Sequence, residues 1–386
     1  MSHHLVRIGT LVHICLLLVA TGVVTSAEAA TLQVGWGKKY LFPSVAAKFA
    51  QDGDTVEIDA GDYPKDAATW KQNNLTIRAV GGKAHLQADG ANAEGKGIWV
   101  IRGNNVTIEN IEFSGAKVHD NNGAGIRVEG AGITVRNCYF HDNQNGILTG
   151  ANKTSDILIE NSEFSHNGAG DGKTHNLYIG AVRSFTLKYS YSHHAQVGHN
   201  VKSRARTNYI LYNRIMDEED GNSSYDIDIP NGGITYMIGN LVEQGPKTEN
   251  SGMISFGAEG LKSSPNEFYL INNTLVNDRP QGGVFVFAKP GTRQVRIVNN
   301  LFIGKGRIEA ADAEDSHNIM GNKNELISPL AYDYQLKPNA KAVNAGIEPG
   351  SAHGFSLQPT DQYVHKASSE PRPKSGKIDV GAYEIK

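Results

Sequence analysis

Three short stretches decide the fold: Val106-Thr-Ile-Glu-Asn110, Ile133-Thr-Val-Arg-Asn137 and Ile157-Leu-Ile-Glu-Asn161. Each alternates β-forming residues and ends in Asn, a residue that suits a turn. Five further copies follow: Phe185-Thr-Leu-Lys-Tyr189, Tyr209-Ile-Leu-Tyr-Asn213, Tyr236-Met-Ile-Gly-Asn240, Tyr269-Leu-Ile-Asn-Asn273 and Arg296-Ile-Val-Asn-Asn300. Their last residues are 27, 24, 28, 24, 27, 33 and 27 residues apart. Short strands at this period, with no helical pattern between them, predict an all-β parallel β-helix with three strands per coil.

The repeat also predicts how the chain is divided. We expect the β-helix over residues 73–325, wound right-handed as parallel crossovers generally are. Residues 30–72 are expected to supply an N-terminal cap and the first strand, and residues 326–386 a C-terminal capping segment. Residues 1–29 have the apolar stretch and the small-residue cleavage site of a signal peptide. This predicts a secreted or periplasmic protein without a membrane span after cleavage.

Composition narrows the classes of partner. Among 386 residues, 37 Lys and Arg face 40 Asp and Glu, which gives a net charge of −3. This balance argues against a nucleic-acid-binding protein and against a polybasic membrane anchor. Cys138 is the one cysteine that follows the predicted signal peptide, so an intrachain disulfide is excluded from the mature chain. We therefore expect a monomer that is stabilised by its core.

The motifs at both ends resemble a known group. They are Asp52-Gly-Asp-Thr-Val56 with Gly61-Asp-Tyr63 near the start, and Asp379-Val-Gly-Ala-Tyr-Glu384 near the end. With the repeats between them, the chain resembles bacterial right-handed parallel β-helix proteins of the pectate-lyase-like superfamily. That resemblance implies the fold. It leaves the activity open, because this fold carries lyases, hydrolases, epimerases and adhesins.

One outward face carries polar residues in register. The segment His175-Asn-Leu-Tyr-Ile-Gly180 recurs 24 residues later as His199-Asn-Val-Lys-Ser-Arg204, and the next coil supplies Tyr225-Asp-Ile-Asp-Ile229. Alternation along a strand then predicts two outward columns. The first contains Tyr178, Lys202 and Asp228, and the second contains Asn176, Asn200 and Asp226. Extension to neighbouring coils adds Trp99, Arg127, Leu148 and Ser255 to this face.

These residue types favour an enzyme that acts on an acidic, uronate-containing polysaccharide by β-elimination. Lys202 is the expected base, Tyr178 the acid, Arg204 the group that holds the uronate carboxylate, and His199 an alternative base. The Lys202 strand resembles the lysine-bearing strand of alginate lyase and chondroitinase B relatives, in which an arginine stands where this chain has Asp228. The expected substrate-binding residues are His175, Asn176, His194, Asn200, Arg206, Tyr225, Asp226 and Asp228.

Three other functions stay open from the sequence. A uronan C5-epimerase uses the same proton abstraction. An inverting glycoside hydrolase would use Asp226 and Asp228 as a carboxyl pair on one face. A non-catalytic polysaccharide-binding or structural β-helix would need no such chemistry. No metal ligands are predicted with certainty, although the acidic run Asp217-Glu-Glu-Asp220 offers oxygen ligands for Ca²⁺.

Overall fold

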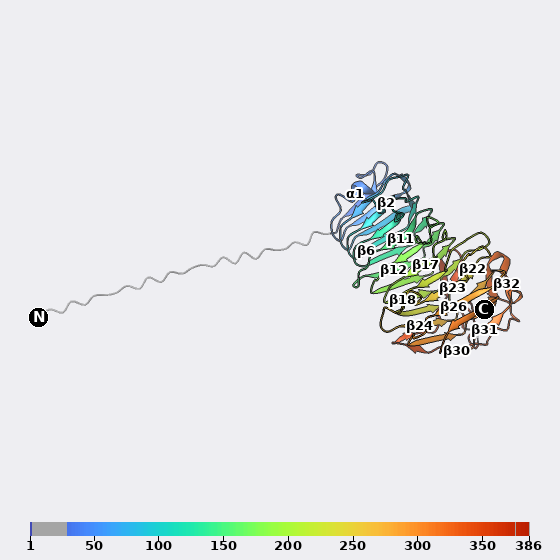
Figure 1. The fold of residues 1–386 in the computed structure, drawn as a ribbon. Coiled ribbons are helices and arrows are strands. Elements are labelled where there is room, and N and C mark those ends of the chain that lie inside the picture. Colours follow the sequence, from blue (N-terminus) through green and yellow to red (C-terminus); the bar gives the residue numbers. More distant parts are fainter. Residues whose placement is uncertain (2–28, 375, 386) are drawn as a thin grey trace.

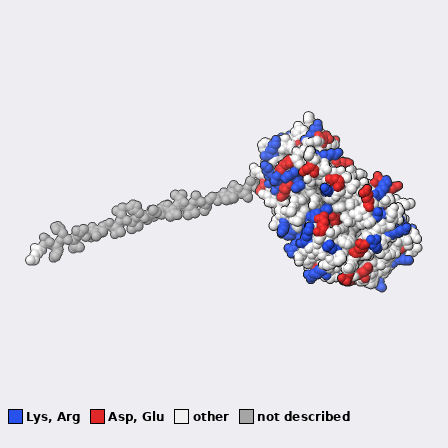
Figure 2. All heavy atoms as spheres, viewed as in Figure 1, with Lys and Arg blue, Asp and Glu red and all other residues white. Residues whose placement is uncertain are grey.

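The computed structural model describes residues 1, 29–374 and 376–385. Successive coils of parallel strands stack into an elongated solenoid that runs from the N-terminal to the C-terminal end of this region (Figure 1). The predicted signal peptide lies almost entirely outside the described residues. Among the described residues, no helix is long and apolar enough to cross a membrane. Acidic and basic side chains are interspersed over the visible surface (Figure 2).

The solenoid has three faces of parallel strands. The first face is a separate ten-stranded sheet. Its strands are β3 (Ala68–Trp70), β5 (Gly97–Ile101), β8 (Ala124–Val128), β11 (Asn145–Thr149), β14 (Leu177–Ile179), β17 (Val201–Ser203), β20 (Ile227–Ile229), β23 (Gly252–Phe256), β26 (Gly283–Ala288) and β29 (Gly306–Ala310).

The other two faces are joined at their N-terminal end by the long strands β2 (Thr55–Pro64) and β4 (Thr76–Gln87), which follow β1 (Thr31–Val34). The second face contains β6 (Val106–Glu109), β9 (Ile133–Arg136), β12 (Asp156–Glu160), β15 (Ser184–Lys188), β18 (Thr207–Leu211), β21 (Ile234–Ile238), β24 (Glu267–Ile271), β27 (Gln294–Val298) and β30 (Glu314–Ser316). The third face contains β7 (Ile111–Ser114), β10 (Tyr139–His141), β13 (Glu163–Ser165), β16 (Tyr191–His193), β19 (Arg214–Met216), β22 (Leu241–Gln244), β25 (Thr274–Asn277), β28 (Leu301–Gly304) and β31 (Ile319–Gly321).

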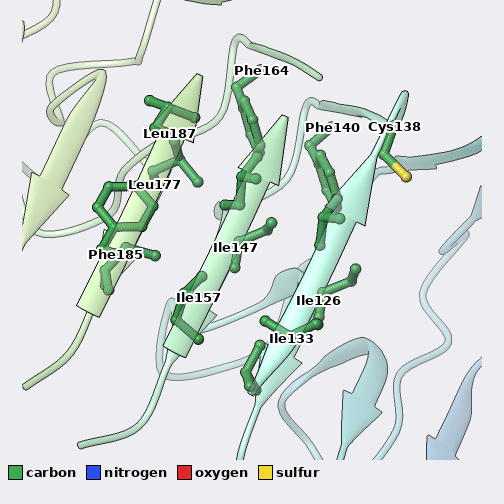
Figure 3. Close-up of a cluster of buried hydrophobic side chains, with 14 of the residues drawn as sticks. Ile126, Ile133, Cys138, Phe140, Ile147, Ile157, Phe164, Leu177, Phe185 and Leu187 are labelled. Carbon is green, nitrogen blue, oxygen red and sulfur yellow. The ribbon is translucent and has the colours of Figure 1, made fainter. Parts of the chain in front are cut away.

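The core consists of inward side chains that stack coil upon coil. The rings of Phe113, Phe140 and Phe164 are parallel, with centroids 5.0 and 4.9 Å apart. Figure 3 shows Phe140 and Phe164 on adjacent coils beside Ile126 and Ile147. Trp99 belongs to this core, where it packs edge-on against Phe113. Its predicted outward position is therefore wrong, because Val100, and not Trp99, pairs with Arg127.

The recurring Asn has two structural roles, not one. In the early copies Asn110, Asn137 and Asn161 are the left-handed turn residues. In the later copies the left-handed residue is the one before the repeat's last Asn, and this Asn points inward. There its side chain accepts two hydrogen bonds from the Asn of the preceding coil, as in Asn213 Nδ2 to Asn240 Oδ1 at 3.0 Å. The sequence alignment thus slips by one residue between the fourth and fifth copies, where Phe185 pairs with Asn208 and not with Tyr209.

The ends of the described chain depart from regular coils. The helix α1 (Pro43–Ala46) lies near the first strands, and parallel pairing begins at β1. After Gly321 two 3₁₀ turns (Lys323–Glu325 and Pro329–Ala331) and three antiparallel pairs follow. The pairs are β32 (Leu326–Ser328) with β33 (Asp333–Leu336), β34 (Ser351–Ala352) with β35 (Phe355–Ser356), and β36 (Asp361–Val364) with β37 (Ser368–Pro371).

This C-terminal segment runs back along the side of the solenoid. The backbone N–H of Thr360 donates to Tyr212 Oη at 3.0 Å, and Asn161 Nδ2 donates to the Ala367 carbonyl at 3.1 Å. The segment therefore covers the flank of several central coils, a contact that the sequence did not indicate.

Candidate functional site

The candidate site lies on the outer side of the first face, over three consecutive coils. Strands β14, β17 and β20 place Tyr178 beside Lys202 and Lys202 beside Asp228. This is the pairing expected from the 24-residue offset. The inward neighbours Leu177, Val201 and Ile227 are fully buried and fix the outward direction of the column.

Two cations on this face are engaged by carboxylates. Lys202 Nζ lies 3.3 Å from Asp228 Oδ2 and 3.6 Å from Glu259 Oε1. Arg204 binds Glu259 through two parallel contacts, Nη1 to Oε2 at 2.7 Å and Nη2 to Oε1 at 3.0 Å. Its Nε also donates to Tyr178 Oη at 3.1 Å. We call these five residues the Lys202 cluster.

Glu259 was not predicted from the sequence. It lies in the loop between β23 and β24, two coils beyond Arg204, and its side chain is 45% exposed. Its one sequence signal is an acidic residue between Gly257 and Gly260, directly after a strand of the same face. That signal says nothing about how far the loop folds back.

His175 and His199 support the cluster from beneath. Their rings stack with centroids 4.6 Å apart. His175 Nδ1 accepts the backbone N–H of His199 at 2.9 Å, and His199 Nδ1 accepts that of Tyr225 at 3.1 Å. Burial, together with the Lys202 charge, lowers the pKa of His199 to about 3.

The ring of His199 is therefore neutral, with its proton on Nε2, which faces Asp228 Oδ2 at 3.5 Å. This geometry makes His199 a hydrogen-bond donor to Asp228 and removes it as a base. Burial raises the pKa of Asp228, although the Lys202 charge opposes that shift.

The second predicted column does not face outward. Asn176, Asn200 and Asp226 are buried, and their side chains form a ladder through the interior. Asn176 Nδ2 donates to Asn200 Oδ1 at 3.1 Å, and Asn200 Nδ2 donates to Asp226 Oδ1 at 3.3 Å. The prediction failed because the chain turns into the strand at these positions, so two successive residues point inward and the alternation is broken. Asp226 and Asp228 consequently lie on opposite sides of the sheet, which overturns the hydrolase pair.

The inner end of this ladder is acidic. Asp217 and Glu243 lie near Asp226, and burial raises the pKa of all three carboxyls. Asp217 accepts hydrogen bonds from Ser223 and Thr248, whereas Asp220 at the surface faces His194. The carboxylates of the run 217–220 therefore point to different partners, and the calcium site suggested by their sequence does not assemble.

The remaining predicted residues are divided between two places. Tyr225 lies beside His199, with ring centroids 5.3 Å apart, and belongs near the cluster. Arg206 is exposed and donates to the Ser264 carbonyl at 3.4 Å. His194 is elsewhere: it follows β16 on the third face, where its ring stacks on His166. It is not a neighbour of the Lys202 cluster, because the coil turns between His194 and β17.

Comparisons with known proteins agree with this architecture. The family description "Right handed beta helix region" matches residues 68–242, which supports the expected handedness. Among solved structures, the crystal structure of pectate lyase Pel9A is similar with a TM-score of 0.65. The match covers 94% of this chain and 97% of that chain at 12% identity, a level that speaks for the fold alone. A search of curated proteins finds no match to the sequence.

Proposed function

We propose that this protein, which has a pectate-lyase-like right-handed β-helix, is a secreted enzyme that cleaves an acidic, uronate-containing polysaccharide by β-elimination at the Lys202 cluster. The observation that carries the proposal is the two-point grip of Arg204 on the Glu259 carboxylate, next to Lys202 and Tyr178. A uronate carboxylate has the same shape and charge as the Glu259 side chain.

Glu259 is a carboxylate that a substrate can replace. It belongs to a surface loop and is nearly half exposed, so solvent weakens its ion pairs. The partners Arg204 and Lys202 are much less exposed, at 19% and 11%. A uronate that took the place of Glu259 would keep the guanidinium paired and would lie between Lys202 and Tyr178.

β-Elimination needs three actions, and each has a residue. Arg204 neutralises the uronate carboxylate, which makes the C5 proton more acidic. Lys202 in its neutral form takes that proton. The C5 electron pair forms the C4=C5 double bond while the C4–O bond breaks, and Tyr178 donates its proton to the leaving oxygen. Because Tyr178 Oη accepts from Arg204 Nε, its own proton is free to point towards the substrate.

Asp228 supplies a route to the neutral lysine. A polymer lying on the cluster excludes water from the Lys202–Asp228 pair, and a medium of low dielectric disfavours two charges. Burial already raises the pKa of Asp228, so this carboxylate is the nearby group suited to receive the Lys202 proton.

The test is product analysis with alginate, pectate, hyaluronan and chondroitin. Elimination gives an unsaturated uronate with ultraviolet absorbance, and the Lys202→Ala and Tyr178→Phe variants are expected to lose it. Arg206→Ala is the matched control, since Arg206 lies outside the cluster and should leave turnover on the sensitive polymer within about twofold. Proton exchange at C5 without chain cleavage would instead show an epimerase. New reducing ends without a double bond would show a hydrolase, and either result would reject elimination.

A further inference from the structure

We propose that His85, Glu112 and His141 form a binding site for a divalent transition-metal ion of the zinc class on the third face of the solenoid. The proposal is independent of the Lys202 cluster, which lies on the first face. It concerns three residues from three consecutive coils that the sequence did not single out.

The register explains why these residues meet. His85 in β4 pairs directly with Glu112 in β7, so both side chains leave the sheet in the same direction. His141 in β10 pairs with Ser114, two residues beyond Glu112. Its ring reaches back diagonally, and its centroid lies 5.7 Å from that of His85.

The distances between the potential ligand atoms suit a small ion. Glu112 Oε1 lies 3.0 Å from His141 Nε2 and 3.5 Å from His85 Nε2. One ligand atom from each of the three residues lies within 4.8 Å of the others. Zinc bonds of about 2.0–2.2 Å at tetrahedral angles require ligand atoms roughly 3.3–3.6 Å apart. The side chains therefore need shifts of only a few tenths of an ångström from these positions to bind one ion.

Each histidine has a carboxylate on its other ring nitrogen. His141 Nδ1 lies 2.6 Å from Asp142 Oδ2, and His85 Nδ1 lies 3.4 Å from Asp62 Oδ1. A carboxylate in this position holds the proton on Nδ1 and leaves the lone pair of Nε2 for a metal, which is the usual arrangement around metal-bound histidine. In both residues this arrangement aims Nε2 at Glu112.

The site is accessible and incomplete as a tetrahedron. The three side chains are between 18% and 24% exposed, so an ion can enter from solvent. Ser114 Oγ lies 2.8 Å from His85 Nε2 and would be displaced from that nitrogen by the ion. Two His and one Glu leave a fourth position open to water, a ligand set that is typical of zinc and cobalt and unlike the all-oxygen set of Ca²⁺.

The direct test is titration of the untagged, chelator-treated protein with Co²⁺ and Zn²⁺. We expect one equivalent of Co²⁺ with the visible absorption of four-coordinate nitrogen and oxygen ligands, and its displacement by Zn²⁺. The double variant His85→Gln/His141→Gln should lose this signal. His119→Gln is the matched control, because His119 is exposed and lies outside the site. Asp142→Asn, which removes only a supporting charge, should weaken affinity by about 10–100-fold.

Circular dichroism of each variant separates loss of the site from loss of the fold, and Asp142→Asn keeps a side chain that tolerates the left-handed backbone at this position. The proposal is overturned if the wild-type protein binds neither ion, or if the folded double variant binds Co²⁺ as tightly as the wild type. It is also overturned if Ca²⁺ displaces Co²⁺ more effectively than Zn²⁺ does. None of these results bears on the proposed elimination, which is measured on another face with another readout.

Discussion

Replacing Asn176 by Ala tests how much the interior amide ladder contributes to stability. Asn176 is fully buried and joins two coils through its side chain. Its Oδ1 accepts the backbone N–H of Asn167 at 3.2 Å and Asn167 Nδ2 at 2.9 Å. Its Nδ2 donates to the His193 carbonyl at 2.9 Å and to Asn200 Oδ1 at 3.1 Å. Alanine removes all of these bonds and leaves a space too small to be refilled by a neighbouring side chain.

The magnitude follows from the groups left without a partner. Two N–H donors of Asn167 lose their acceptor, although Nδ2 keeps its bond to the Phe140 carbonyl. A buried donor or acceptor without a partner costs about 1–3 kcal/mol, so we expect a loss of roughly 2–6 kcal/mol in the free energy of unfolding. That is a large share of the 5–15 kcal/mol that is typical of a folded protein.

The assay is urea unfolding followed by both tryptophan fluorescence and circular dichroism. Two probes are needed because solenoid coils can unfold in separate steps. The control is Asn122→Ala, since Asn122 is exposed and bonds only to nearby Asp120, and it should change stability by less than about 0.5 kcal/mol. If Asn176→Ala is as mild as the control while both probes report one transition, the ladder does not have the assigned role.

Three further predictions rest on single groups. Asp226→Asn should stabilise the protein at neutral pH: the folded state holds the Asp226 proton more tightly than the unfolded chain, so wild-type stability falls as pH rises through the raised pKa, and the two proteins should converge below about pH 4 in a series of thermal melts. An equal gain at every pH would contradict that sign. Cys138 should resist thiol reagents in the native protein and react on unfolding, because burial raises its pKa to about 11; rapid native labelling would show that the coil opens there. Glu259→Gln should lower KM for the acidic polymer by removing the carboxylate that competes for Arg204, whereas an unchanged KM would mean that the substrate does not use this position.

The fold was accessible from the sequence because it depends on a local, repeated pattern. Alternating β-forming residues at a period near 27 leave little choice but stacked parallel coils, and the structure has them. The neighbours Tyr178, Lys202 and Asp228 were also accessible, since equal offsets between strands translate directly into register.

The orientation of Asn176, Asn200 and Asp226 was decided only by the tertiary structure, because alternation holds within a strand and fails where the backbone bends into one. Contacts that span several coils escaped for a different reason. The distance that Glu259 reaches back to Arg204, and the diagonal approach of His141 to Glu112, depend on loop path and side-chain rotamer. A repeat in the sequence sets the height of each coil along the axis, but it carries no record of which side chains lean across from one coil to the next.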